Sequence, residues 1–219
     1  MRLTPFTSTL QVRGRSLKVT LIPQHRRTLS MNVKDEGLIV KLPFGADLEK
    51  TMAWISSKEA WVAKRMERLE AMALNDDEIW YLGRKTKVVD GKETKFSPAG
   101  IVVKQGVLLE TALRQHAVNV LSEQFNLAVA ETGISPRSLK FRMMNRSWGR
   151  CTSKGDITLN PRLISCEPSF IRYVCIHELM HLKHLNHSPL FWQEVKQHVP
   201  DVSRVKKNSI LLQKDRLGL

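Results

Sequence analysis

The sequence predicts an α+β protein. Between residues 8 and 42, apolar and polar residues alternate with the two-residue period of half-buried strands. Between residues 109 and 132, apolar residues recur near the helical spacing, and Gly133 follows as a helix terminator. A histidine-rich helix is expected near the carboxyl end. We therefore expect an amino-terminal antiparallel β region with a helix, followed by a region that combines paired histidines on a helix with a small sheet.

The front of the chain is expected to hold most of the strands. Residues 8–42 are typical of a four-stranded antiparallel meander, and Asp47 can cap a single helix that runs to about residue 74. Four more short strands are expected between residues 79 and 104. Gln105-Gly106 is expected to mark the boundary between the β-rich front of the chain and its rear part. The prediction is a β-rich amino-terminal region with one long helix, residues 1–105, and a catalytic region, residues 106–219, or one integrated domain.

The rear of the chain alternates helices with a small sheet. After the helix at 109–132, strands are expected at residues 139–144 and 156–160. Asp201 can cap a final helix to about residue 216, anchored by Val205, Ile210 and Leu211.

The chain is organised around His177-Glu178-Leu179-Met180-His181, which has the pattern H-E-x-x-H. Residues four apart share one face of a helix, so His177 and His181 can direct two imidazoles at one metal ion. Zinc favours such ligands in tetrahedral geometry, and a catalytic site leaves one position for water. Glu178 lies beside the first ligand, where its carboxylate can take a proton from that water. The pattern therefore predicts metal-assisted hydrolysis.

A third ligand is expected just after this helix. The helix is predicted to run to residue 185, Asn186 suits a helix end, and Ser188-Pro189 can start the next helix. His187 then lies in a tight turn from which its imidazole can return to the metal. We prefer it as the third ligand.

Other residues compete for that position: His184, Glu194 and His198. His184 shares the helix face but lies roughly 10 Å from His177 along the axis, which disfavours convergence on one ion. A histidine-rich surface helix without metal is the remaining interpretation. Three fixed residues arise by chance on the order of a few times in a hundred chains, but the glutamate and the turn favour a metal site.

The stretch HELMHLKHLNHSPLFW resembles the signature of the YgjP-like metallopeptidase family, HEL-x-HL-x-x-x-NHS-x-x-FW. It is more distantly similar to the SprT-like proteases, in which a histidine in a similar turn is the third ligand. Upstream, Trp148-Gly149-Arg150-Cys151 and residues 155–160 match the family block WG-x-C…G-x-I-x-LN, and the resemblance extends over most of the chain. It implies a zincin-like catalytic region and one zinc ion per chain. It also implies metal ligands at His177, His181 and His187, with Glu178 as the catalytic acid/base.

The block around Trp148 departs from the family pattern in its arginines. The family often has a serine where Arg150 stands and an arginine where Ser147 stands, so the two candidate guanidinium groups here belong to Arg146 and Arg150. Either one is expected to help stabilise an oxyanion. In zinc peptidases of similar build, a strand at this point forms the upper rim of the cleft. Its edge, here Ile157, Thr158 and Leu159, is expected to bind substrate backbone, and an ordinary edge strand is the alternative.

Composition limits the partners. The formal net charge of +14 attracts polyanions, yet no basic tract dominates and no zinc-finger or recognition-helix signature is present, so nucleotide or nucleic-acid binding is a secondary expectation. Three cysteines, Cys151, Cys166 and Cys175, are too few for a disulfide framework. No signal-like or membrane-spanning run occurs, and we expect a cytoplasmic protein without a membrane partner.

Three functions are compatible with these observations. The first is a zinc metallopeptidase that cleaves a peptide or protein substrate through a metal-activated water. The second is a metal-dependent hydrolase of a nucleotide phosphoanhydride, a nucleoside triphosphate pyrophosphatase. The third involves nucleic acid, either as a non-enzymatic zinc module or as an SprT-like protease associated with nucleic acid. The intact Glu178 disfavours a purely structural zinc site.

Overall fold

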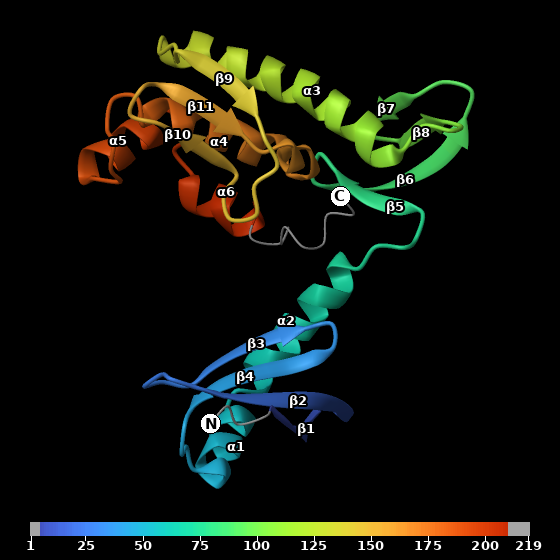
Figure 1. The fold of residues 1–219 in the computed structure, drawn as a ribbon, viewed down its shortest axis with the longest axis vertical. Coiled ribbons are helices and arrows are strands. Elements are labelled where there is room, and N and C mark those ends of the chain that lie inside the picture. The colour runs from blue at the N-terminus through green and yellow to red at the C-terminus, as the bar shows by residue number, and fades with distance from the viewer. Residues whose placement is uncertain (1–4, 210–219) are drawn as a thin grey trace. The chain divides into compact units, whose positions relative to one another are not determined.

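A computed structural model describes residues 5–209, and the chain divides into two compact units between Ala73 and Leu74 (Figure 1). Helices and sheets occur in separate stretches of the chain, and the α+β prediction is confirmed. The predicted boundary at residue 105 is a different division and stays a prediction.

The first unit contains a four-stranded sheet in the order β1-β2-β4-β3. Its strands are β1 (Phe6–Val12), β2 (Arg15–Gln24), β3 (Ser30–Lys34) and β4 (Gly37–Pro43). The sheet is antiparallel at β1–β2 and β3–β4, but β2 pairs in parallel with β4, so the predicted meander is wrong. Burial explains the order. Leu38, Val40 and Leu42 of β4 are all buried, which suits a central strand, whereas only Val33 of β3 is buried.

Two helices, α1 (Leu48–Ser56) and α2 (Glu59–Met72), replace the single helix predicted for this unit. Asp47 caps α1 as predicted, accepting a hydrogen bond from the Lys50 N–H at 3.0 Å. The break lies at Ser57, whose hydroxyl donates to the Trp54 carbonyl at 2.7 Å and so satisfies a carbonyl that a continuing helix would use. Ile55 and Val62 are buried in the same apolar core as the sheet.

The second unit begins with the predicted middle sheet, in the order β5-β6-β8-β7. Its strands are β5 (Glu78–Tyr81), β6 (Arg84–Gly91), β7 (Lys95–Ser97) and β8 (Gly100–Lys104). All four lie within one residue of the predicted stretch. The turn after β5 is tied to the rest of the unit, since the N–H groups of Leu82 and Gly83 donate to the carbonyls of Ile164 and Ser165.

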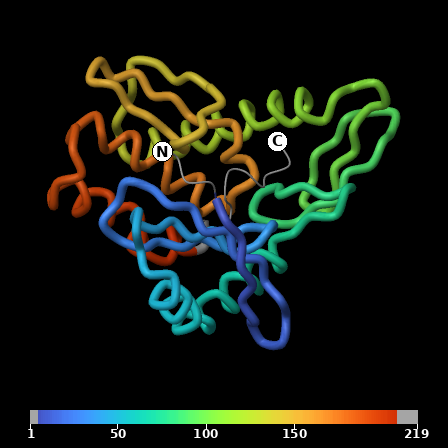
Figure 2. Tube along the Cα trace, turned by 60° about the horizontal axis from the view of Figure 1, so that its bottom comes forward, coloured from blue at the N-terminus to red at the C-terminus, as the bar shows by residue number. Residues whose placement is uncertain are grey.

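The remainder of the second unit is built around α3 (Leu109–Thr132), which lies beside α4 (Pro168–Met180), as Figures 1 and 2 show. Gly133 ends α3 in the left-handed conformation with φ 68°, as its position predicts. A three-stranded sheet, β10-β11-β9, and a 3-10 helix, η1 (Pro161–Ser165), complete this part. Its strands are β9 (Ser138–Phe141), β10 (Gly149–Cys151) and β11 (Asp156–Leu159).

Two short helices end the described chain, α5 (Pro189–His198) and α6 (Val202–Ser209). Ser188 caps α5 as predicted and accepts a hydrogen bond from the Phe191 N–H at 3.3 Å. The predicted anchors Ile210 and Leu211 lie outside the described residues. No helix within residues 5–209 has the length and apolar content needed to cross a membrane.

Candidate metal centre

The H-E-x-x-H residues lie at the carboxyl end of α4. His177 is in its last turn, and His181 is the C-cap. The helix ends at Met180, five residues earlier than the sequence predicted. The reason is local: the His184 carbonyl turns back to His181 Nδ1, 2.9 Å away, and residues 182–184 follow in tight turns. The shorter helix leaves a longer loop in which His187 can approach the motif.

Three imidazoles converge at this point. One ring nitrogen from each of His177, His181 and His187 lies within 4.8 Å of the others. Nε2 of His177 is 3.1 Å from Nε2 of His187. Two ligand atoms of a tetrahedral zinc ion are separated by about 3.3 Å, given zinc–nitrogen distances near 2.0–2.1 Å. The donor set therefore fits a small divalent cation.

The outer nitrogens of two of these rings already have partners. Nδ1 of His177 lies 3.3 Å from the Tyr173 hydroxyl, and Nδ1 of His181 lies 2.9 Å from the His184 carbonyl. A carbonyl accepts only, so His181 must carry its proton on Nδ1 and present Nε2 as a lone pair. Such outer contacts fix the orientation of metal-binding histidines.

Aromatic side chains from α5 surround the histidines. The Phe191 ring, fully buried, stacks on His181 with centroids 4.6 Å apart. The Trp192 ring stacks on His187 at 5.6 Å and an interplanar angle of 20°. Phe191 and Trp192, which follow the turn in the family-like motif, thus form the aromatic surface against which the imidazoles pack.

Burial favours the neutral form of the His177 and His187 rings. It lowers the pKa of His177 to about 3, with further contributions from His181, His187 and Lys206. Burial also lowers the pKa of His187, assisted by the charges of His181 and Lys206. Neutral imidazole is the form that binds metal.

The competing ligand candidates have other partners. Nε2 of His184 lies 3.0 Å from the Glu194 carboxylate, which also accepts a hydrogen bond from Lys183 at 2.8 Å. His198 lies 3.0 Å from Glu131 of α3. Within residues 5–209, the structure groups only the preferred three histidines as a possible metal site.

Glu178 is held against β10. Its side chain is buried, with 6% of the residue exposed. It accepts a hydrogen bond from the Cys151 backbone N–H, and burial raises its pKa to about 7. A Cβ atom on Gly149 would lie 2.5–2.7 Å from the Glu178 side chain, so only glycine leaves room for this carboxylate. A carboxyl group with this pKa can both accept and return a proton near neutral pH.

The sequence predicted the wrong strand as the edge of the small sheet. Ile157, Thr158 and Leu159 belong to β11, which is the central strand, paired with β10 on one side and β9 on the other. Its backbone groups are therefore already used by neighbouring strands. The edge strands are β10 and β9. On β10, residues 149 and 151 alternate with the residues that bond to β11, so their backbone groups point away from β11, and the Cys151 N–H among them donates to Glu178.

The side chains of Arg150 and Arg146 are exposed and are not directed at Glu178 as Gly149 is. Arg150 is exposed, and its side chain projects from the face of β10 opposite to that of Gly149, because successive side chains of a strand alternate. Arg146 is exposed in the loop before β10. Their predicted role at an oxyanion stays a prediction.

Sequence reasoning assigned no role at the centre to Tyr173, and it quoted Gly149 and Cys151 only as part of the Trp148 block. Tyr173 lies four residues before His177, a spacing that could have revealed it. Gly149 and Cys151 contribute through backbone geometry, which no pattern of side chains reveals.

Cys166 and Cys175 are buried thiols, and burial raises the pKa of each to about 12.

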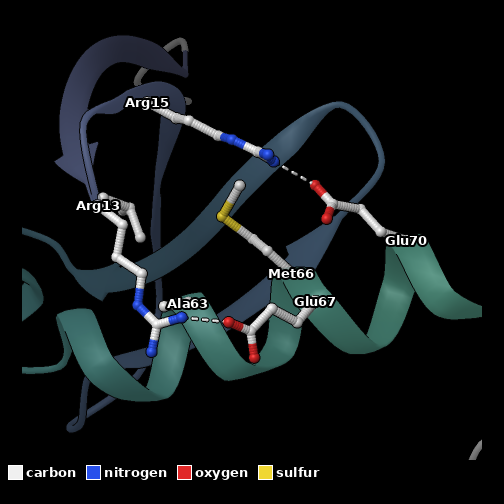
Figure 3. A pocket seen from close by; sticks show the side chains of 7 residues that line it. Arg13, Arg15, Ala63, Met66, Glu67 and Glu70 are labelled. Atoms are coloured by element: carbon white, nitrogen blue, oxygen red, sulfur yellow. Dashed lines mark hydrogen bonds and ion pairs between the residues drawn. The ribbon is translucent and has the colours of Figure 1, made fainter.

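A pocket of about 210 Å³ lies in the first unit, between the β1–β2 hairpin and α2. Figure 3 shows Arg13 and Arg15 directed at Glu67 and Glu70, respectively, across Met66. Because these charges pair with one another, the pocket contains no group set that resembles the histidine centre.

Comparison with known proteins identifies a family. The family model for the YgjP-like metallopeptidase domain matches residues 27–209. Among solved structures, the chain is similar to the metallopeptidase zymogen abylysin of Pyrococcus abyssi. The sequences are 29% identical, the TM-score is 0.37, and the match covers 43% of this chain and 93% of the abylysin chain. The search of curated proteins gave no match.

The class of protein is therefore a metal-dependent peptidase. The chain belongs to the YgjP-like metallopeptidase family, because the family model spans most of its length.

Proposed function

We propose that this metallopeptidase binds one zinc ion through His177, His181 and His187 and uses Glu178 as its acid/base. The convergence of the three imidazole nitrogens within 4.8 Å carries the proposal. Imidazole also suits other divalent metals, but tetrahedral nitrogen ligation with an open fourth position is typical of catalytic zinc.

When bound, the ion would act as a Lewis acid that activates a water molecule and polarises the scissile carbonyl. The chain's own residues supply the proton path. Glu178 takes a proton from the attacking water and returns it to the leaving amine. The Cys151 N–H orients the carboxylate for both transfers, and burial keeps its pKa near the pH at which transfer in each direction is efficient.

The substrate backbone would pair with β10 rather than with Ile157–Leu159. β10 is an edge strand of its sheet and lies against α4 at Glu178. An extended peptide would add to this edge through main-chain hydrogen bonds to Gly149 and to the Cys151 carbonyl, because the Cys151 N–H is used by Glu178. Such bonds tolerate many side chains. Peptides or proteins are thus the substrate class that this geometry suits.

The test starts with metal content. Protein purified without a polyhistidine tag is analysed by plasma mass spectrometry, then incubated with a proteome-derived peptide library whose cleavage sites are read by mass spectrometry. We expect near-stoichiometric zinc and cleavage that a chelator abolishes. Glu178→Gln should retain zinc and lose about 10²–10⁴-fold in turnover, the usual contribution of a general acid/base.

Glu123→Gln is the matched control, since Glu123 is exposed on α3. A Glu178→Gln protein with near-normal cleavage would reject the assignment of Glu178. Absence of metal after zinc is added back would reject the centre itself. Hydrolysis of nucleoside triphosphates in place of peptides would favour the phosphoanhydride alternative.

A further inference from the structure

Arg150 is the middle residue of the edge strand β10, and its side chain lies on the face of the small sheet that points away from α4. Its neighbour Gly149 faces α4, because a Cβ atom there would meet the Glu178 side chain. Successive side chains of a strand alternate between the two faces, so Arg150 projects from the outer face, where it is exposed. Its cross-strand neighbour on that face is Thr158 of β11.

The described chain supplies no carboxylate to the Arg150 guanidinium. The acidic residue on the outer face of β11 is Asp156, whose carboxylate already accepts hydrogen bonds from Arg137 at 2.6 and 2.9 Å and from Ser138 at 2.7 Å. Within residues 5–209, neither a hydrogen bond nor an ion pair holds the guanidinium of Arg150. The edge of the sheet therefore presents a cation that a ligand can reach.

Arg150 is close to the proposed acid/base without being directed at it. The residues on either side of it both touch Glu178, Gly149 through its close approach and Cys151 through its backbone N–H. A strand rises about 3.2–3.4 Å per residue. A peptide that pairs with β10 would therefore pass Arg150 within about two residues of the bond that Glu178 serves.

Such a peptide would place one of its side chains directly beside Arg150. The backbone groups that point away from β11 belong to residues 149 and 151, so an antiparallel peptide residue opposite Arg150 forms a pair without mutual hydrogen bonds, the kind in which side chains lie closest. Opposite Cβ atoms are then about 4.5–5.5 Å apart. A guanidinium at this distance can bind a carboxylate through short charge-assisted hydrogen bonds.

We infer that Arg150 is a specificity-determining residue that selects an aspartate or glutamate at the single peptide position opposite it on β10. The inference rests on the proposed peptidase function and on β10 as the strand that binds the substrate. The two neighbouring peptide residues direct their side chains to the face of α4, so the acidic preference is confined to one position. An exposed cross-strand ion pair gives a preference of roughly two- to fivefold.

The experiment is cleavage-site profiling of the zinc-loaded full chain on a proteome-derived peptide library. For the wild type, we expect Asp and Glu to be enriched about threefold at one position within about two residues of the cleaved bond, and not at the positions on either side. In Arg150→Gln the enrichment should fall to about one. Arg150→Glu should replace it with enrichment of Lys and Arg at the same position.

Lys140→Gln is the matched control. Lys140 is an exposed cation on the same face of the sheet, but it lies on β9, where it pairs with Thr158. At about 4.8 Å per strand, it is about 14 Å from a peptide added to β10, so its loss should leave the profile unchanged. A Lys140→Gln profile that loses the acidic preference would assign it to the general charge of the face and overturn the role of Arg150.

Three synthetic peptides separate selection from participation in the reaction. They are a cleaved sequence with Glu at the selected position, the same sequence with Gln there, and a version with the Glu moved by one residue. The wild type should cleave the first with a kcat/KM about threefold above the other two, whereas Arg150→Gln should cleave all three equally. A large fall in kcat for the neutral peptide in Arg150→Gln would place the guanidinium at the oxyanion and overturn its role in selection.

Binding provides a readout that does not depend on turnover. Zinc-loaded Glu178→Gln should bind the first peptide about threefold more tightly than the second by calorimetry, and the additional change Arg150→Gln should remove that difference.

Two failures are distinguishable. If the wild type cleaves no peptide at all, the proposed function fails. If it cleaves peptides without acidic enrichment at a single position, or if Arg150→Gln keeps the enrichment, the role of Arg150 is wrong while the peptidase stands.

Discussion

The two compact units of this chain use charged side chains in opposite ways. In the first unit, the side chains of Arg15 and Glu70 pair at 2.7 Å while remaining 69% and 57% exposed (Figure 3). In the second unit, Glu178 is 6% exposed and has a backbone N–H as its hydrogen-bond partner. Water screens the first pair, so it can contribute little. Burial raises the pKa of the second group to about 7 and prepares it for proton transfer. The burial of its carboxylate, more than the presence of charge, distinguishes the unit that contains the three histidines.

The largest effect is expected from loss of a metal ligand. His187→Ala should reduce metal affinity by at least about 100-fold, more than the loss of an outer contact would cause, and abolish peptidase activity. Plasma mass spectrometry of dialysed protein measures this directly. His184→Ala is the control, because His184 pairs with Glu194 and should leave zinc in place. Stoichiometric zinc in His187→Ala would move the third ligand to His184 or Glu194.

The next effect tests the contact between β10 and Glu178. Gly149→Ala places a Cβ 2.5–2.7 Å from the Glu178 side chain and must displace it. A misplacement of about 1 Å costs roughly 100-fold in rate, so we expect kcat to fall by about that factor with metal content unchanged. Gly100→Ala is the control, since its Cβ would meet nothing nearer than 3.9 Å. Equal activity of the two variants would show that Glu178 is not confined by β10.

A smaller effect is expected at Tyr173. Tyr173→Phe removes the hydroxyl 3.3 Å from His177 Nδ1 but keeps the ring near Lys206. Zinc affinity should fall about 10-fold, as for other outer partners of metal-binding histidines. Competition with a fluorescent chelator gives the dissociation constant. Unchanged affinity would mean that the hydroxyl does not orient His177.

A pH-dependent effect is expected in the small sheet. Hydrogen bonds from Arg137 and Ser138 lower the pKa of Asp156 to about 2. A lowered carboxyl pKa stabilises the fold above the unfolded value near 4, and this stabilisation disappears as the pH falls through about 2. Arg137→Met should therefore lower Tm modestly at pH 7, with a difference from wild type that shrinks between pH 4 and pH 2. Thermal scans at each pH, with Arg142→Met as control, decide this; a constant difference would contradict it.

The smallest effect is expected in the first unit. Arg15→Met breaks an exposed ion pair with Glu70, which is worth at most about 1 kcal/mol. Tm should change slightly, and peptide cleavage and zinc content should not change. A large loss of activity would show that the pocket of the first unit takes part in catalysis and would end the contrast between the two units.

Much of the fold follows from local sequence. The extent of α3, the Ser188 cap of α5 and the four strands of the middle sheet were predictable, because periodicity and capping act within a few residues. Predictions failed where strand pairing decides and where a side chain bonds to the backbone of its own loop. β4 takes the central position in its sheet because its side chains are more buried, and α4 stops at Met180 because His184 turns back towards His181.

The sequence by itself determined the donor types and the family: an H-E-x-x-H pattern, a third histidine after a helix end, and a Trp148 block that matches the YgjP-like pattern. Only the tertiary structure decided which strand is the edge, why Gly149 must be glycine, and that Lys206 lies beside the centre. The physical reason is distance along the chain. Helical spacing relates residues a few positions apart, but Glu178 meets Gly149, and Lys206 meets Trp192 and Tyr173, only after strands and helices have packed.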